Sequence, residues 1–168
     1  MRASLLEYKT GTLEDSDEQS SRLESVGVTQ KGNAMIEWVI PQHLARSSRP
    51  GYFLGKGAVG RDTVDTWLSE VCDAGIKSII CLLSDEHLKL YQGLSPSRSL
   101  VDYYRDRGFD VAHLPVLDYQ RPPLSNDDLQ RVAAAYSQLP KPVLIHCSAG
   151  IDRTGMAVAY LLETSLSQ

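Results

Sequence analysis

The chain has 168 residues, of which 42% are apolar and 23% are charged, with a net charge of −4 at pH 7. This composition is typical of a globular protein, and the length predicts one domain that buries about 70% of the surface of the extended chain. No apolar run approaches the ~20 residues of a membrane span, and the N-terminus does not resemble a secretory signal. The negative net charge argues against a nucleic-acid partner. Three cysteines without paired spacing predict neither a disulfide framework nor a metal site, so we expect a reducing, cytoplasmic location.

Two stretches of different character divide the chain. Residues 1–33 are polar and rich in Ser, Glu and Asp, which predicts an N-terminal extension attached loosely to the rest. Residues 34–168 are expected to form the globular domain, which is short at its C-terminal end.

Strand-like and helical segments alternate along this domain. Apolar or β-type runs predict strands at residues 35–40, 51–55, 76–84, 109–116 and 143–146. Helical periodicity and capping residues predict helices at residues 61–75, 99–106, 129–139 and 156–163. The alternation predicts an α/β fold with a mainly parallel central sheet and helices on both faces.

The ten residues HCSAGIDRTG, 146–155, lie between the last predicted strand and the last predicted helix. A loop at such a junction turns backbone N–H groups toward one centre, and the helix N-terminus adds partial positive charge, so the segment predicts a phosphate site. The same environment favours the thiolate form of Cys147. The predicted phosphate-binding residues are Ser148, Ala149, Gly150, Ile151, Asp152 and Arg153. Arg153 can return its guanidinium to the bound phosphate, and Thr154 can donate its hydroxyl to the Cys147 sulfur.

The segment resembles the signature loop of the cysteine-dependent protein tyrosine phosphatase superfamily, Cys-x5-Arg followed by Ser or Thr. Over roughly residues 36–162 the chain is similar to the compact dual-specificity branch. The resemblance implies a phosphatase without metal or cofactor, in which Cys147 attacks phosphorus and a cysteinyl-phosphate is then hydrolysed. It implies a phosphorylated protein as substrate, with phosphotyrosine ahead of phosphoserine and phosphothreonine. His146 would support the loop from behind.

The family also uses an aspartate on a loop as general acid and base. Asp118 fits this role, because it follows a predicted strand, precedes Pro122-Pro123 and stands 29 residues before Cys147. Asp127 and Asp128 are alternatives, although their place at a helix start favours capping.

The other cysteines are expected to be small buried hydrophobic residues. Cys72 falls on the apolar side of a predicted helix and Cys81 falls inside an apolar strand. Some relatives protect the nucleophile with a second cysteine on a neighbouring strand, which makes Cys81 an alternative redox partner. The remaining histidines, His43, His87 and His113, show no ligand spacing.

Three other functions are alternatives for this sequence. Residues 55–60 match G-x-G-x-x-G before a helix, a pattern of dinucleotide-binding proteins, but too few residues follow Ser84 for a second half and a substrate site. A module that binds phosphate with little turnover is disfavoured because cysteine, arginine and acid are all present. A phosphoinositide or inositol phosphate substrate is disfavoured because no base occupies a variable position of the loop, where Asp152 adds a negative charge.

Two surface features complete the expectations. Arg46, Arg49, Lys56 and Arg61 make the segment from 41 to 61 basic and free of acids, and we interpret it as a solvated face that could attract an anion. The last helix is apolar nearly all round, so its exposed surface near residues 156–162 predicts self-association.

Overall fold

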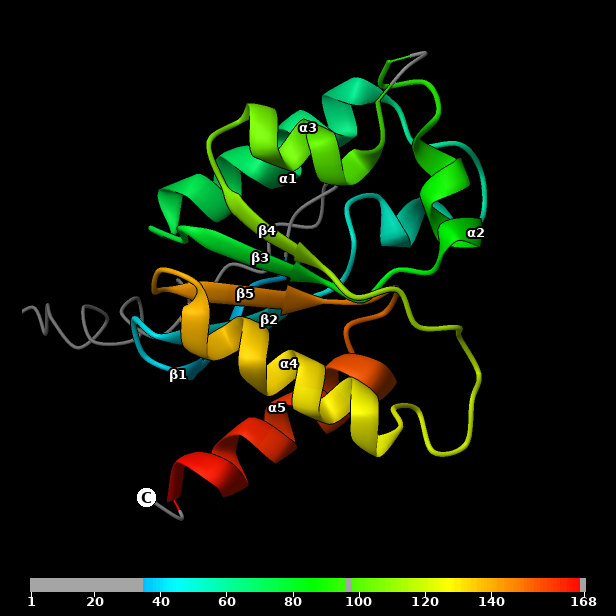
Figure 1. The fold of residues 1–168 in the computed structure, drawn as a ribbon. Coiled ribbons are helices and arrows are strands. Elements are labelled where there is room, and N and C mark those ends of the chain that lie inside the picture. The colour runs from blue at the N-terminus through cyan, green and yellow to red at the C-terminus, as the bar shows by residue number, and fades with distance from the viewer. Residues whose placement is uncertain (1–34, 96–97, 167–168) are drawn as a thin grey trace, which may run out of the picture.

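The computed structural model describes residues 35–95 and 98–166 of the chain (Figure 1). The expected extension at 1–33 lies outside the described residues. Within them, one sheet has the strand order β1-β2-β5-β3-β4. The strands are β1 (Glu37–Ile40), β2 (Leu44–Ser47), β3 (Ser78–Cys81), β4 (Asp110–His113) and β5 (Val143–His146). Only β1 is antiparallel to its neighbour, so the prediction of a mainly parallel α/β fold is confirmed.

Helices cover both faces of the sheet. The α-helices are α1 (Arg61–Asp73), α2 (Asp85–Leu88), α3 (Leu100–Asp106), α4 (Asn126–Gln138) and α5 (Asp152–Leu166). Two 3-10 turns, η1 (Tyr52–Leu54) and η2 (Lys89–Tyr91), lie in the connections. Figure 1 shows α1 and α3 on one face and α4 and α5 on the other, with α2 beside the ends of the strands. No helix in this part of the chain is long and apolar enough to cross a membrane.

The two central strands are buried on both faces, which explains their continuous apolar sequences. Alternate residues of β3 pack into separate cores: Ile79 lies in the cluster beneath α1 and α3, and Ile80 in the cluster beneath α4 and α5. Ile145 of β5 joins the second cluster, whereas Leu144 joins the first. The period-2 alternation of β-strands therefore builds both cores at once.

Glycine conformation overturns one predicted strand. The 3-10 turn η1 takes the place of this strand, because Gly51 and Gly55 on either side of it adopt φ of +73° and +84°, which an extended strand does not permit. The G-x-G-x-x-G segment therefore follows a turn instead of a strand, which removes the structural context of a dinucleotide site. The strand that does form nearby, β2, has the sequence LARS and was missed because its arginine and serine hide the apolar pattern.

One expectation about a helical side chain is wrong. Cys72 is exposed, since the buried stripe of α1 consists of Val64, Trp67, Leu68 and Val71. In the apolar helix α5, Val158 and Leu161 face the core, while Met156 is only half-buried, as expected of a helix with apolar residues nearly all round. Self-association through this helix stays a prediction.

Beneath β5, an aromatic cluster holds the histidine that precedes the cysteine. Trp67 and Tyr104 stack with ring centroids 5.5 Å apart, and both rings meet His146 edge-on. His146 Nδ1 lies 3.1 Å from the Cys147 carbonyl oxygen and Nε2 lies 3.2 Å from the Tyr104 hydroxyl. A carbonyl oxygen can only accept, so Nδ1 carries the proton and Nε2 accepts from Tyr104. Burial keeps this imidazole neutral by lowering the pKa of His146 to about 4.

We expect this histidine to make stability depend on pH. Between pH 6.5 and about pH 4, the His146 imidazole is protonated in the unfolded chain but stays neutral in the folded protein. The free energy of unfolding should therefore fall by about 3 kcal/mol between these two pH values. Urea unfolding across the range, with His146→Asn for comparison, measures this loss. The variant should show a flatter pH dependence, whereas His43→Asn, at an exposed turn, should match the native protein. Equal slopes for native and His146→Asn protein would contradict the expectation.

Candidate active site

The parallel strands bring four loops together at one edge of the sheet. Ser47 of β2 and Cys81 of β3 both stand in register with His146 of β5, and His113 of β4 pairs with Cys81. The residues that follow these four positions therefore leave the sheet at the same level. Ligand sites of α/β proteins form at the carboxyl ends of parallel strands in this way.

The signature loop, residues 147–152, connects β5 to α5 and closes tightly on itself. Cys147 is buried, and its sulfur accepts a hydrogen bond from the Gly150 N–H at 3.3 Å. Gly150 has φ +75°, and a Cβ there would lie 2.4 Å from the Ser47 carbonyl oxygen. Arg46 donates to the Gly150 carbonyl at 2.5 Å. The loop is thus fastened to the end of β2, with the Gly150 N–H turned toward the cysteine sulfur.

Arg153 lies in the first turn of α5, and its guanidinium is almost fully buried, with 2% of the residue exposed. Nη1 donates to the Val116 carbonyl at 2.7 Å and to the Leu82 carbonyl at 3.3 Å. Nη2 forms an ion pair with Asp118 Oδ1 at 3.2 Å. The buried Nε–H has no hydrogen-bond partner among the described residues. A buried donor without a partner is costly, and an anion at this position would satisfy it.

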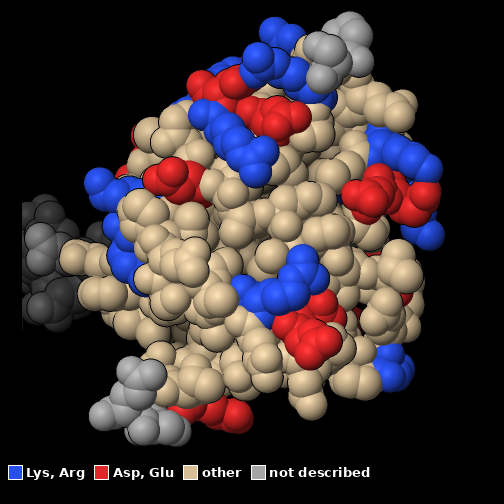
Figure 2. Space-filling model, in the orientation of Figure 1, with Lys and Arg blue, Asp and Glu red and all other residues tan. Residues whose placement is uncertain are grey.

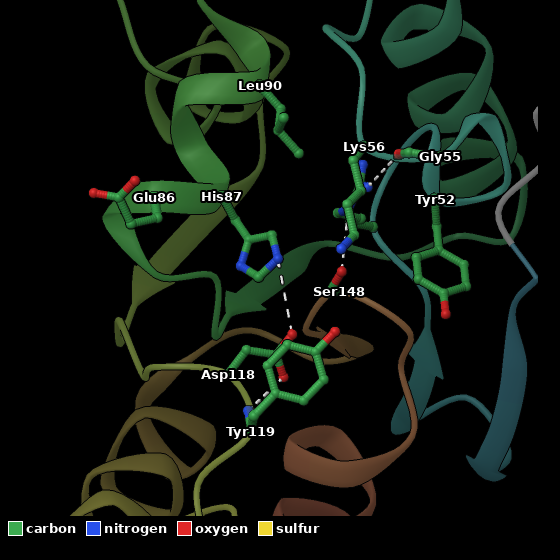
Figure 3. Close-up of a pocket in the computed structure, with 10 residues that line it drawn as sticks. Tyr52, Gly55, Lys56, Glu86, His87, Leu90, Asp118, Tyr119 and Ser148 are labelled. Atoms are coloured by element: carbon green, nitrogen blue, oxygen red, sulfur yellow. Dashed lines mark hydrogen bonds and ion pairs between the residues drawn. The ribbon is translucent and has the colours of Figure 1, made fainter.

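Asp118 lies in the loop between β4 and α4 and is held from three sides. Oδ1 accepts from the Tyr119 N–H at 3.0 Å and pairs with Arg153, while Oδ2 lies 3.8 Å from His87 Nε2 (Figure 3). The structure therefore places the sequence-predicted acid beside the sequence-predicted arginine. Asp128, the alternative, forms a capping box with Ser125 at the start of α4, as its position indicated.

His87 was not singled out by its sequence context, yet it reaches the site from α2. Its Nδ1 lies 3.1 Å from the Ser84 hydroxyl, and Nε2 points toward Asp118. Partial burial, reinforced by the positive charge of Arg153, lowers the pKa of His87, and the Asp118 carboxylate opposes this shift only in part. Near neutral pH the imidazole is therefore uncharged, so its contact with Asp118 is that of a neutral ring.

The hydrogen bond expected from Thr154 to the cysteine is absent. The Thr154 hydroxyl is buried and has no partner in the part of the chain that the structure describes. The Gly150 N–H contacts the sulfur instead. Cys81 is buried as predicted, and burial raises the pKa of its thiol to about 12, so it is protonated at neutral pH.

A pocket of about 470 Å³ opens beside the signature loop, between residues 52–56, helix α2 and the loop that carries Asp118 (Figure 3). Lys56 and Glu86 lie on its walls, and Ser148 lies at its base. Arg49 also lines it, but with only 4% of the residue exposed, so its expected place on a solvated face is wrong. Its burial was not predicted because it lies two residues after β2, a strand that the sequence pattern did not reveal.

On the face shown in Figure 2, acidic and basic side chains lie close to one another without an extended patch of one sign. Among residues 35–95 and 98–166, no group of three or more His, Cys, Asp or Glu side chains could hold a metal ion. The groups that converge on the site are thus a thiol, two buried guanidinium groups, a carboxylate and a neutral imidazole.

Comparisons with known proteins identify phosphatases as similar in sequence and in fold. Among curated proteins, the dual specificity protein phosphatase OPG106 of vaccinia virus is 36% identical over 57 residues, which are 32% of this chain. The chain covers 33% of that viral protein's length. Among solved structures, Tk-PTP in its active form is similar with a TM-score of 0.58 and 23% identity, over 79% of this chain and 75% of that one. A kinase associated phosphatase, with its catalytic-site cysteine substituted by serine, has a TM-score of 0.59 at 20% identity, over 79% and 74% of the two chains. At these identities the two structures support the fold alone.

A family model extends the agreement to most of the domain. The model, described as "Tc-R-P: Polymorphic toxin system, DSP-PTPase phosphatase", matches residues 55–165. The matched range includes Asp118, Cys147 and Arg153, and it exceeds half of the chain. The chain therefore belongs to this family of dual-specificity and tyrosine-type phosphatases.

Proposed function

We propose that the domain, residues 34–168, hydrolyses a phosphate monoester of a protein through a cysteinyl-phosphate, with phosphotyrosine ahead of phosphoserine and phosphothreonine. One observation carries the proposal: a buried arginine with an unpartnered Nε–H pairs with a carboxylate and follows a loop in which the Gly150 N–H contacts a buried cysteine sulfur. Each of the three side chains supplies one role that hydrolysis without a metal requires. A reducing compartment such as the cytoplasm suits a free thiol nucleophile.

Phosphate binding would draw on two sets of donors. The backbone N–H groups of residues 148–153 would surround the phosphoryl oxygens at the N-terminus of α5, where the helix dipole favours an anion. Arg153 would offer Nε and Nη2 as a fork, while Nη1 stays bound to the carbonyls of Leu82 and Val116. Because Nη2 pairs with Asp118 in the present structure, substrate would take this donor over from the carboxylate.

In the first step, the Cys147 thiolate attacks phosphorus and the bond from phosphorus to the ester oxygen breaks. Asp118, once released from Arg153 and protonated, gives its proton to that leaving oxygen. In the second step, Asp118 as carboxylate takes a proton from water, which attacks the cysteinyl-phosphate. The sulfur–phosphorus bond breaks, and inorganic phosphate and the thiolate are produced.

The surroundings of the loop favour a substrate with a single phosphate. Ile151 is exposed beside a second hollow of about 320 Å³, where Met35 and Phe53 add apolar surface. Tyr119, 84% exposed, lies next to Asp118 and lines the pocket that Ser148 also lines. Such walls suit the ring of a phosphotyrosine better than a polyphosphorylated inositol, which remains the alternative substrate together with binding without turnover.

Two substitutions test the mechanism on a small aryl phosphate near pH 6 with a chelator present. Cys147→Ser should abolish phosphate release, because the nucleophile is lost. Asp118→Asn should reduce kcat by about 10²- to 10⁴-fold, and by more for a phenol that is a poor leaving group. Asp127→Asn, which removes an equal charge from the first turn of α4, should stay within about twofold of native activity, since surface changes there have small effects. Turnover that survives in Cys147→Ser would refute the mechanism. Phosphate binding without turnover in the native protein would favour the binding module.

The tight contact of Gly150 with β2 gives a second test. In Gly150→Ala the new Cβ would meet the Ser47 carbonyl oxygen at 2.4 Å, and the positive φ is strained for alanine. The loop must move, and misplacement by about 1 Å can reduce kcat/KM about 10²-fold. Gly93→Ala is the control, because a Cβ there meets nothing within 4 Å. Native kcat/KM in Gly150→Ala would show that the loop's present shape is not the one that reacts.

A further inference from the structure

Arg49, a second buried arginine that lies outside the signature motif, binds the signature loop. The backbone N–H of Arg49 donates to the Ser148 carbonyl at 2.9 Å, and its Nε donates to the Ser148 hydroxyl oxygen at 3.2 Å. Arg49 therefore binds Ser148, the residue immediately after the cysteine, through both its main chain and its side chain. Ser148 and Gly55, which both accept hydrogen bonds from Arg49, line the pocket together with Lys56 (Figure 3).

The other donors of Arg49 reach neutral acceptors. Nη1 lies 3.3 Å from both the Pro50 carbonyl and the Tyr91 hydroxyl, and Nη2 donates to the Gly55 carbonyl at 3.0 Å. The guanidinium forms no ion pair with a described carboxylate, since the ion pairs of these residues all involve other cations. A buried, uncompensated charge is expensive, and a protein that keeps one gains where an anion comes close.

The positive charge of Arg49 affects two histidines of the site. It contributes to the lowered pKa of His146, next to the cysteine, and of His87, next to Asp118, in both cases after burial and Arg153. The two buried guanidinium groups thus act on the same small volume. Asp118 offsets the charge of Arg153 in this structure, whereas Arg49 has no such partner among the described carboxylates.

The bond to Arg49 also orients the Ser148 hydroxyl. Its oxygen accepts from Nε, so its own hydrogen must point elsewhere, and Ser148 lines the pocket. Accepting a bond from a cation polarises a hydroxyl and strengthens it as a donor.

We propose that Arg49 is a positioning residue of the phosphate site, which directs the Ser148 hydroxyl toward the bound phosphate and adds a second positive charge to the pocket. This inference rests on the proposed phosphate site, yet it needs no turnover to be tested. It explains why a basic residue from the β2 end of the domain is buried next to the signature loop.

Binding of inorganic phosphate, followed by isothermal titration calorimetry, is the primary test. Arg49→Met, which keeps an apolar stem but loses the charge, should weaken binding about tenfold or more. Ser148→Ala should weaken it several-fold, and the double variant should bind no more weakly than Arg49→Met alone, because Ser148 acts only when Arg49 orients it. Additive losses, or native affinity in Arg49→Met, would overturn the proposal.

Steady-state kinetics with an aryl phosphate supply a readout that a merely structural role would not move. In Arg49→Met, KM should rise by a larger factor than kcat falls. Arg49→Lys keeps the charge without the Nε donor, so its KM should lie between those of the native protein and Arg49→Met. Arg49→Lys also covers the case in which Arg49→Met fails to fold; native phosphate affinity in Arg49→Lys would remove the assigned role of the Nε bond.

Two controls separate positioning from packing. Tyr91→Phe removes the hydrogen bonds of the Tyr91 hydroxyl with Arg49 Nη1 and the Pro50 carbonyl but leaves the charge and the Ser148 bond in place, so phosphate affinity should be kept. Arg131→Met removes an equal charge from exposed α4 and should also bind phosphate as the native protein does. A loss in Tyr91→Phe equal to that in Arg49→Met would assign the effect to packing and overturn the proposal. Native protein that binds phosphate but hydrolyses no ester would end the proposed function and leave this inference standing.

Discussion

The burial of the Arg153 guanidinium is the constraint on which the site depends. A charge in this position must find partners, and it finds them in the carbonyls of Leu82 and Val116 and in the carboxylate of Asp118. These partners come from the end of β3 and from the loop after β4, so a residue of α5 joins three parts of the fold. The sheet register that brings these carbonyls to one level is therefore also what positions the reactive groups.

The electrostatics of the site follow from an imbalance of buried charge. Two guanidinium groups and one carboxylate surround a loop whose own dipoles already favour an anion. The two flanking imidazoles add no charge near neutral pH, because burial lowers the pKa of each. A bound phosphate dianion would thus compensate charge that the protein leaves unbalanced, and it would release Asp118 from its ion pair. In the proposed mechanism, substrate binding and activation of the acid would be coupled through a single guanidinium.

The sequence predicted those features that depend on local pattern. The apolar runs form the buried strands β3 and β5, and Ser125 caps α4. The Cys-x5-Arg segment forms a loop in which the Gly150 N–H contacts the Cys147 sulfur. Asp118 could be placed because its loop sits between a recognisable strand and a capped helix. The positions of Arg49 and His87 could not be predicted, since each depends on tertiary contacts: Arg49 is buried against Ser148, 99 positions away, and His87 meets Asp118 from a one-turn helix. Thr154 shows the reverse case, where the motif predicted a contact that the local geometry does not make.

The contact of Gly150 with the end of β2 has a consequence for the order in which the domain forms. The loop takes its shape against Ser47, and Arg46 spans 104 positions of sequence to hold the Gly150 carbonyl. Contacts between such distant segments form late, because the entropy of closing the loop must be overcome first. During synthesis, β2 could pair with β5 only after almost the whole domain has been made. The cysteine would meet its N–H donors only when the central strand of the sheet is inserted, so thiol reactivity would report the completion of folding.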